Sequence, residues 1–206
     1  MSVLTGFTAG LLLITLSELG DKTFFIGAIL AMRHPRRWVF VGVTAALFTM
    51  TLLSVLLGQV ATHLIPDYVQ WIAVALFLGC GVRLLYTAIT MTADHLADEQ
   101  TAALEAIQTQ PGFAKGSWIQ ALVLRAFTLT LLAEWGDRTQ FATITLAAAH
   151  HPVGVVLGAT LGHAICAAIA VICGRLIAGK LSERWLTAMS GALFVLFGSL
   201  AILEAL

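Results

Sequence analysis

The chain alternates between long hydrophobic runs and short polar breaks. A helix needs about 20 apolar residues to cross the hydrocarbon core of a bilayer, and six runs reach that length. Their approximate limits are residues 4–31, 38–62, 69–92, 118–147, 153–178 and 185–204. The pattern predicts an all-α membrane protein with six transmembrane helices, because a β-barrel would show short segments of alternating polarity instead.

The pattern repeats itself at an offset of 116 residues. The clearest repeated motif is Glu-Leu-Gly-Asp-Lys-Thr at residues 18–23, which returns as Glu-Trp-Gly-Asp-Arg-Thr at residues 134–139. Each copy has three predicted helices, and an odd number of helices turns the second copy upside down in the membrane. We therefore expect two inverted three-helix repeats, residues 1–92 and 118–206, joined by a cytoplasmic linker at 93–117.

Basic residues in the breaks predict the orientation of the helices. Short cytoplasmic loops carry an excess of Lys and Arg. Every Lys or Arg that lies in a break is on the same side of the predicted membrane. These residues are Arg33, Arg36, Arg37, Lys115, Lys180 and Arg184. This distribution places both termini outside the cytoplasm.

The composition agrees with a membrane protein and excludes an ordinary soluble domain. Hydrophobic residues make up 59% of the chain and charged residues 11%, whereas soluble domains are usually about 25% charged. The formal net charge is zero, so nothing indicates a nucleic acid as partner. The expected partner is membrane lipid, around a monomer or a homo-oligomer.

The repeated motif places charges in the middle of the first and fourth predicted helices. Its carboxylates are Glu18, Asp21, Glu134 and Asp137. An ionised residue in hydrocarbon costs at least about 2.5 kcal/mol, so two copies at the same spacing indicate a function. On one helix, Glu18 and Asp21 face the same side, and Lys22 is close enough to pair with Glu18. The two motifs together carry a charge of −2, which matches a divalent cation, and oxygen ligands suit Ca²⁺, Mn²⁺ or Mg²⁺.

Other motif residues have supporting or gating roles in this interpretation. Lys22 and Arg138 are tethered counter-ions that hold the carboxylates in place, and Trp135 walls off or gates the site. Gly20 and Gly136 allow close backbone approach or an unwound turn. The first and fourth runs are longer than a straight span needs, which predicts a tilt or a break near the motif.

Further polar groups are expected beside the carboxylates. They are Thr15, Ser17, Thr23, Thr44, Thr130, Thr139, Gln140, Thr160 and His163. His163 has no counterpart in the first repeat, where Leu47 stands. A lone histidine among small residues is more often a packing residue than a ligand. As a ligand it would favour Mn²⁺ over Ca²⁺, because imidazole suits softer cations.

Metal and protons would compete for the same carboxylate oxygens, which is a simple physical route to cation/proton antiport. The alternatives are ion pairs that only lock the packing, a cation-selective channel, or an intramembrane aspartyl protease built on Asp21 and Asp137. Against the protease, each Asp is followed by a base that keeps it ionised, whereas a catalytic dyad shares a proton. No enzymatic activity is expected, and no cofactor apart from the transported cation.

Both copies match every defined position of the signature E-x-G-D-[KR]-[ST]. The chain thereby resembles the six-helix cation/proton antiporters that carry this signature twice. These include MneA-type bacterial manganese exporters and the Golgi and chloroplast Mn²⁺/Ca²⁺ transporters. The resemblance covers essentially the whole chain. It implies export of Mn²⁺, with Ca²⁺ as the alternative, in exchange for protons, by alternating access at the level of the motifs. The short bacterial-style chain implies a multi-pass protein of the bacterial cytoplasmic (inner) membrane.

Overall fold

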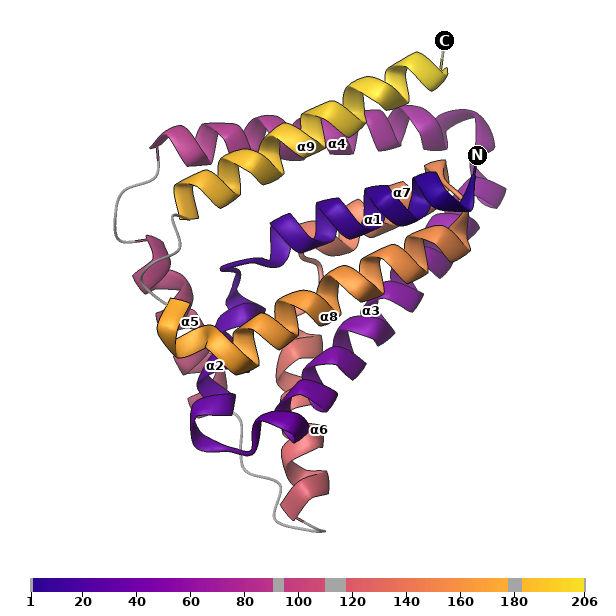
Figure 1. Cartoon of the computed structure of the whole chain (residues 1–206). Coiled ribbons are helices and arrows are strands. Elements are labelled where there is room, and N and C mark those ends of the chain that lie inside the picture. Colours follow the sequence, from indigo (N-terminus) through magenta and orange to yellow (C-terminus); the bar gives the residue numbers. More distant parts are fainter. Residues whose placement is uncertain (1, 91–94, 110–117, 178–182, 206) are drawn as a thin grey trace.

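The computed structural model describes residues 2–90, 95–109, 118–177 and 183–205. Within these ranges the regular structure is entirely α-helical, which confirms the predicted all-α fold (Figure 1). The helices are α1 (Val3–Glu18), α2 (Lys22–Arg33), α3 (Arg36–Leu64), α4 (Pro66–Thr90), α5 (His95–Thr109), α6 (Trp118–Glu134), α7 (Arg138–Ala149), α8 (Pro152–Ile177) and α9 (Glu183–Ala205). The predicted cytoplasmic residues Lys115 and Lys180 lie outside the described ranges.

Four helices, α3, α4, α8 and α9, are each long and apolar enough to cross a membrane. The first and fourth hydrophobic runs are each split into two helices. The α1–α2 pair is bent by 66° and the α6–α7 pair by 75°. By length and composition, the described residues therefore contain four spans, or six if each bent pair counts as one. The break predicted from the length of these runs is present in both.

The two copies of the repeat pack against each other in a reciprocal way. Helix α1 lies along α8, and the equivalent α6 lies along α3. Likewise α2 packs against α8 and α7 against α3, while α4 and α9 pair with each other (Figure 1). Gln59, near the end of α3, donates a hydrogen bond of 2.6 Å to the carbonyl of Ala147, which lies shortly before α8 begins. The equivalent helices α3 and α8 therefore run in opposite directions.

Glycines at equivalent positions let these helices approach closely. A Cβ atom added to Gly158 on α8 would lie 2.1 Å from the carbonyl oxygen of Phe7 on α1. One added to Gly42 on α3 would lie 2.6 Å from the carbonyl oxygen of Val123 on α6. Small residues give this close backbone contact between membrane helices, where van der Waals packing drives association. The close contacts hold the first half of α1 against α8 and the first half of α6 against α3.

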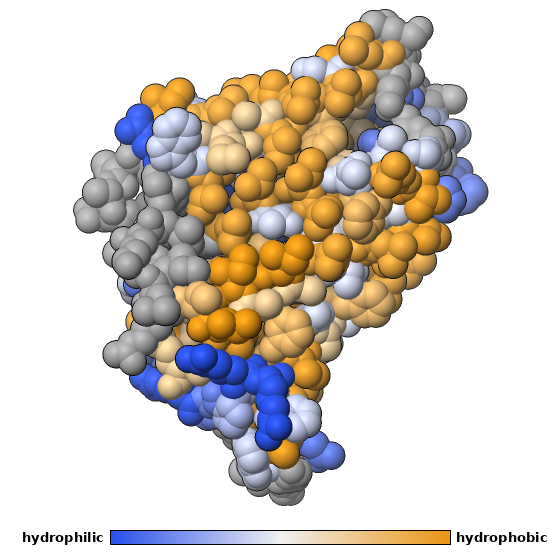
Figure 2. Space-filling view, in the orientation of Figure 1, coloured by the Kyte–Doolittle hydropathy of each residue, from blue (hydrophilic) through white to orange (hydrophobic). Residues whose placement is uncertain are grey.

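The outer surface suits contact with lipid. Helix α8 exposes a row of large hydrophobic side chains, Val153, Leu157, Leu161, Ile165 and Ile172. Figure 2 shows a largely hydrophobic face, with hydrophilic residues at its lower end and along its edges. Arg33, Arg36 and Arg37 are exposed where α2 meets α3. This separation of polar and apolar surface is typical of membrane proteins, whose polar loops lie in water.

The linker contains helix α5, which packs against α2. Its buried side is formed by Ala103 and Ile107. Arg125 on α6 donates a hydrogen bond of 2.8 Å to the carbonyl oxygen of Ile107. The described part of the linker is thus a docked helix with one apolar side.

Candidate cation-binding site

Each repeated motif lies at the break between two helices. Helix α1 ends at Glu18 and α2 begins at Lys22, while α6 ends at Glu134 and α7 begins at Arg138. Gly20 and Gly136 have φ values of +83° and +81°. This left-handed conformation is unfavourable for residues with a Cβ atom and is readily adopted by glycine. The glycine in each motif therefore allows the sharp turn that ends one helix and starts the next.

The two glutamates are buried at the ends of α1 and α6. Glu18 and Glu134 are each only 2% exposed. Thr23 donates a hydrogen bond of 3.0 Å to Glu18 Oε2, and Thr139 donates one of 3.0 Å to Glu134 Oε2. The other oxygen of each glutamate, Oε1, is buried and has no hydrogen-bond partner among the described residues. The threonines orient the carboxylates and leave one oxygen of each for another ligand.

A third carboxylate joins the two glutamates. Glu18, Asp21 and Glu134 each offer one oxygen, and these oxygens lie within 4.8 Å of one another. Oxygen ligands bind divalent cations at about 2.0–2.6 Å, so ligands of one ion lie up to about 5 Å apart. The three oxygens therefore fit around a single ion. Because Glu18 and Asp21 belong to the first motif and Glu134 to the second, both copies contribute to this candidate site.

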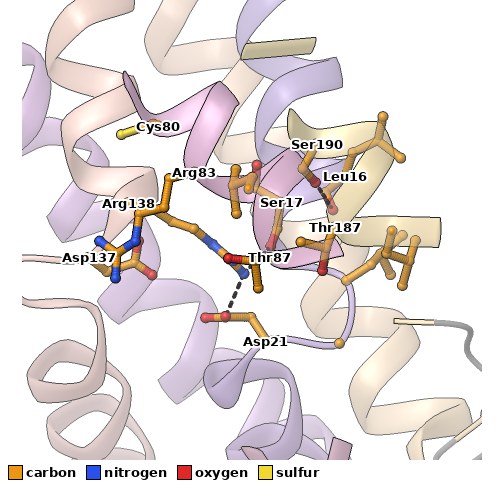
Figure 3. A pocket seen from close by; sticks show the side chains of 14 residues that line it. Leu16, Ser17, Asp21, Cys80, Arg83, Thr87, Asp137, Arg138, Thr187 and Ser190 are labelled. Atoms are coloured by element: carbon orange, nitrogen blue, oxygen red, sulfur yellow. Dashed lines mark hydrogen bonds and ion pairs between the residues drawn. The ribbon is translucent and has the colours of Figure 1, made fainter. Parts of the chain in front are cut away.

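Arg138 connects the two motifs. Its Nη2 atom lies 2.6 Å from Asp21 Oδ1 and donates a hydrogen bond of 3.1 Å to the carbonyl oxygen of Ser17. Figure 3 shows Arg138 extending from the second motif to Asp21. The guanidinium neutralises Asp21 in a partly buried position, where an isolated charge would be unfavourable. The partner of this arginine is therefore in the other copy, and its role as a tethered counter-ion stays a prediction.

The predicted pairing of Lys22 with Glu18 is wrong. That prediction assumed one continuous helix, in which residues four apart are neighbours. Helix α1 ends at Glu18 and the chain turns at Gly20, so Lys22 starts a different helix. In the part of the chain that the structure describes, no ion pair joins the two side chains.

Asp137 has a different environment from its counterpart Asp21. It accepts a hydrogen bond from the backbone N–H of Thr139 and so caps the start of α7. Asp21 occupies the same position before α2 but makes no such capping bond. Asp137 is not a member of the group of three, so the repeated motif is not symmetric in its contacts. Its role as a cation ligand stays a prediction.

A cavity of about 460 Å³ lies beside the carboxylates. Figure 3 shows the side chains around it. They include Asp21, Asp137 and Arg138 from the motifs, Cys80, Arg83 and Thr87 from α4, and Thr187 and Ser190 from α9. Ser190 donates a hydrogen bond of 3.0 Å to the carbonyl oxygen of Leu16, which fixes α9 against the end of α1. Asp21 both lines this cavity and belongs to the group of three, so it links the cavity to the buried glutamates.

The remaining predicted residues have varied environments. Gln140 accepts a hydrogen bond of 2.7 Å from the N–H of Gly136, so it supports the turn in the second motif. Trp135 is 66% exposed and is not among the residues that line the cavity. Its role as a wall or gate of the site stays a prediction. Thr44 and Thr160 lie at equivalent positions of α3 and α8, with hydroxyl groups buried and without partners among the described residues. Their contact with a cation stays a prediction.

Sequence reasoning missed the residues that α4 and α9 contribute to the cavity. Thr87, Thr187 and Ser190 are small polar residues in otherwise apolar runs, and such residues are common at helix contacts in membranes. Arg83, a charged residue in the third run, also lines the cavity. The polar residues of the third and sixth runs were the available signal, although a weak one.

Broken helices that bring charged groups together between two repeats are typical of secondary transporters. The chain belongs to the GDT1 family of divalent cation/proton antiporters, whose sequence pattern matches residues 6–92 and 122–206. This confirms the resemblance drawn from the two motifs.

Similar proteins are known from a cyanobacterium and from plants. The chain is 52% identical to the GDT1-like protein sll0615 of Synechocystis sp., over 95% of each chain. It is 41% identical to GDT1-like protein 3 of Oryza sativa subsp. indica, over 92% of this chain and 70% of the relative. It is 37% identical to GDT1-like protein 5 of Arabidopsis thaliana, over 98% of this chain and 97% of the relative. No solved structure matches the chain.

Proposed function

We propose that this protein is a secondary transporter that exports a divalent cation from the cytoplasm in exchange for protons. The proposed cation is Mn²⁺, with Ca²⁺ as the alternative. The observation that carries the proposal is the group formed by Glu18, Asp21 and Glu134, whose oxygens lie within 4.8 Å of one another. A site made of carboxylate oxygens suits hard divalent cations such as Mn²⁺ and Ca²⁺.

The charges at this site support an exchange with protons. Arg138 neutralises Asp21 across the two motifs. Glu18 and Glu134, each bonded by a threonine hydroxyl, then carry the two negative charges that a divalent cation balances. When the cation leaves, two unpaired carboxylates in a buried site are unfavourable. Protons provide the same neutralisation, so cation and protons occupy the site in turn.

The proposed architecture is six spans arranged as two inverted repeats, with each bent helix pair forming one span. The reciprocal packing of α1 on α8 and of α6 on α3 supports it, as do the opposite directions of α3 and α8. The exposed arginines between α2 and α3 support a cytoplasmic position for that end, because cytoplasmic loops are rich in basic residues. Both termini are then outside the cytoplasm. The bacterial cytoplasmic membrane is the proposed location, in line with the cyanobacterial relative.

In this orientation the cavity beside Asp21 faces the cytoplasm. Its walls come from the later half of α4 and from the first turns of α9, which lie toward the linker end of the molecule. Helices α4 and α9 pack chiefly against each other. We infer that this pair moves relative to the other helices, closing the cytoplasmic cavity while an opening forms on the other side. That motion is alternating access around a fixed site.

Transport in proteoliposomes tests the proposal. We expect Mn²⁺ to move against its own concentration gradient when an imposed pH gradient drives protons across the membrane in the opposite direction. A proton ionophore should stop this movement. An internal Mn²⁺-quenched dye and an internal pH dye report the two fluxes in the same vesicles. Protein-free liposomes are the control. Mn²⁺ flux that ignores the pH gradient would instead support a channel, and vesicles without any divalent cation flux would refute transport altogether.

A further inference from the structure

His163 is a buried polar residue on α8 that breaks the symmetry of the repeats. It is 4% exposed, and its Nδ1 atom has no hydrogen-bond partner among the described residues. The equivalent position in α3 is Leu47, which is also buried. A histidine that only fills space in a membrane bundle is expected to hydrogen-bond a neighbour. His163 does not do so in the described structure, so packing alone does not explain it.

A carboxylate oxygen of the candidate site lies close to this imidazole. His163 Nδ1 lies 4.0 Å from Glu18 Oε1, which is also buried and without a partner among the described residues. This distance is too long for a hydrogen bond, which needs about 2.7–3.2 Å between the heavy atoms. It is suitable for two ligands of one cation, since each would lie about 2.0–2.5 Å from the ion. The two atoms are therefore placed to share an ion.

A small cavity of about 10 Å³ lies beside His163, and Glu134 and His163 both line it. Thr51 and Ser54 from α3 also line it. Their hydroxyl groups donate to carbonyl oxygens of their own helix, those of Leu47 and Met50, so their oxygens can still accept a ligand. A space of this size suits about one water or ion without its hydration shell.

Glu18 is thus close both to Asp21 and to His163. Asp21 belongs to the group that adjoins the large cavity, and His163 lies toward the small one. Glu134 is a member of the three-carboxylate group and also lines the small cavity. Two overlapping coordination positions result that share Glu18. One is completed by Asp21 and Glu134, and the other by His163, whose small cavity Glu134 also lines.

We propose that His163 is a nitrogen ligand of the transported cation in the second of these positions, and that this ligand selects Mn²⁺ over Ca²⁺. The inference rests on the proposed function, because it concerns the same site. Ca²⁺ binds almost entirely through oxygen, whereas first-row transition metals accept imidazole nitrogen. A cation that moves from Asp21 toward His163 exchanges an oxygen ligand for a nitrogen ligand. This exchange favours Mn²⁺ over Ca²⁺ at the step in which the cation moves away from the large cavity.

The test measures binding in the purified full-length protein in detergent. We expect His163→Leu, which introduces the residue found at the equivalent position 47, to lower the ratio of Mn²⁺ to Ca²⁺ affinity by about tenfold or more, the range seen when groups around a metal are lost. His163→Asn places an amide oxygen near the position of Nδ1, so it should retain Ca²⁺ binding and lose the preference. His63→Leu, at an exposed position near the end of α3, is the control and should keep the wild-type ratio.

Pulsed electron paramagnetic resonance of Mn²⁺ bound to the wild-type protein gives an independent readout, because a coordinated imidazole couples its nitrogen spin to the metal. We expect this coupling in the wild type and its loss in His163→Leu. Bound Mn²⁺ without nitrogen coupling, or an unchanged affinity ratio in a folded His163→Leu protein, would overturn the role of His163 and leave the transport proposal standing. A wild-type protein that binds neither cation would refute the proposed function itself. If His163→Leu does not fold, the wild-type spectrum and His163→Asn decide the question.

Discussion

Replacement of Glu134 by Gln, or of Glu18 by Gln, is expected to abolish transport of the cation. Each glutamate provides one buried oxygen without a hydrogen-bond partner among the described residues. Each also supplies one of the two negative charges that are left in the group of three carboxylates after Arg138 neutralises Asp21. Loss of groups that only support a metal ligand typically lowers affinity 10–100-fold. Loss of a charged ligand should therefore lower the initial rate of Mn²⁺ transport in proteoliposomes by at least about 100-fold.

The fold of these variants should persist. Glutamine has nearly the shape of glutamate, and its carbonyl oxygen can still accept the hydrogen bond from Thr23 or Thr139. Size-exclusion chromatography after membrane extraction checks this. The matched control is Glu105→Gln on α5, where the same substitution changes an exposed side chain and should leave the rate unaltered. A wild-type rate in either single variant, with the control unchanged, would show that the cation does not use this site.

The sequence was sufficient to predict the helical class and the position of the two breaks. Hydrophobic runs depend only on neighbouring residues, so their length can be read directly. The charged motif and its glycine indicated where the first and fourth runs are interrupted, and Gly20 and Gly136 are the residues with positive φ in the described part of the chain. The convergence of both motifs followed from the internal repeat, because symmetry relates the midpoints of equivalent helices.

The pairing of charges could not be predicted in the same way. Sequence spacing suggested partners within one helix, but Arg138 pairs with Asp21 across the two copies. This contact depends on how the broken ends of α1 and α6 are placed relative to each other, which no local pattern specifies. The different environments of Asp21 and Asp137 arise for the same reason. Both precede a helix, where Asp is a favoured cap, yet only Asp137 makes the capping bond.

This difference between the two aspartates predicts different effects of removing their charges. Asp21→Asn should weaken Mn²⁺ binding by about tenfold or more, because Asp21 belongs to the group of three carboxylates. Asp137→Asn should have an effect of less than about threefold on affinity, because an amide oxygen can keep the cap on α7. Isothermal titration of the two purified variants measures both effects. Equal losses in the two variants would show that Asp137 is as important a ligand as Asp21.

The sequence singled out His163 as a departure from the repeat, but it did not establish the role of this residue. The replacement of Leu47 by a histidine at the equivalent position singled it out, but the sequence favoured a packing role. The decisive facts are that Nδ1 has no hydrogen-bond partner within the described part of the chain and that it lies 4.0 Å from Glu18 Oε1. The walls of the large cavity were harder to foresee, because α4 and α9 carry no motif. Their polar residues can be assigned to the cavity wall only once these helices are known to lie beside the broken ends of α1 and α6.

Cys80 is expected to react with a thiol reagent from the cytoplasmic side of the membrane and not from the other side. It lines the large cavity, whose walls lie toward the proposed cytoplasmic end. The membrane-impermeant reagent sulfonatoethyl methanethiosulfonate, applied to inside-out and right-side-out vesicles at constant pH, distinguishes the two sides. Mass spectrometry then reports the modified fraction at each cysteine. Cys166 is an internal control and should stay unmodified from either side. It is 3% exposed, and its thiol donates a hydrogen bond to the carbonyl oxygen of Thr15.

Mn²⁺ should slow the modification of Cys80 by about tenfold. A ligand shifts a conformational equilibrium only when it binds one state better than the other, and a tenfold change in population needs about 1.4 kcal/mol of preference. If the bound cation favours the state in which α4 and α9 close over Asp21, the cavity is lost and Cys80 becomes inaccessible. The same concentration of Mn²⁺ should have no effect in Glu134→Gln, because the protection requires the cation site. Modification of Cys80 from the extracytoplasmic side alone would reverse the proposed orientation. Protection by Mn²⁺ that persists in Glu134→Gln would show that closure of the cavity does not depend on this cation site.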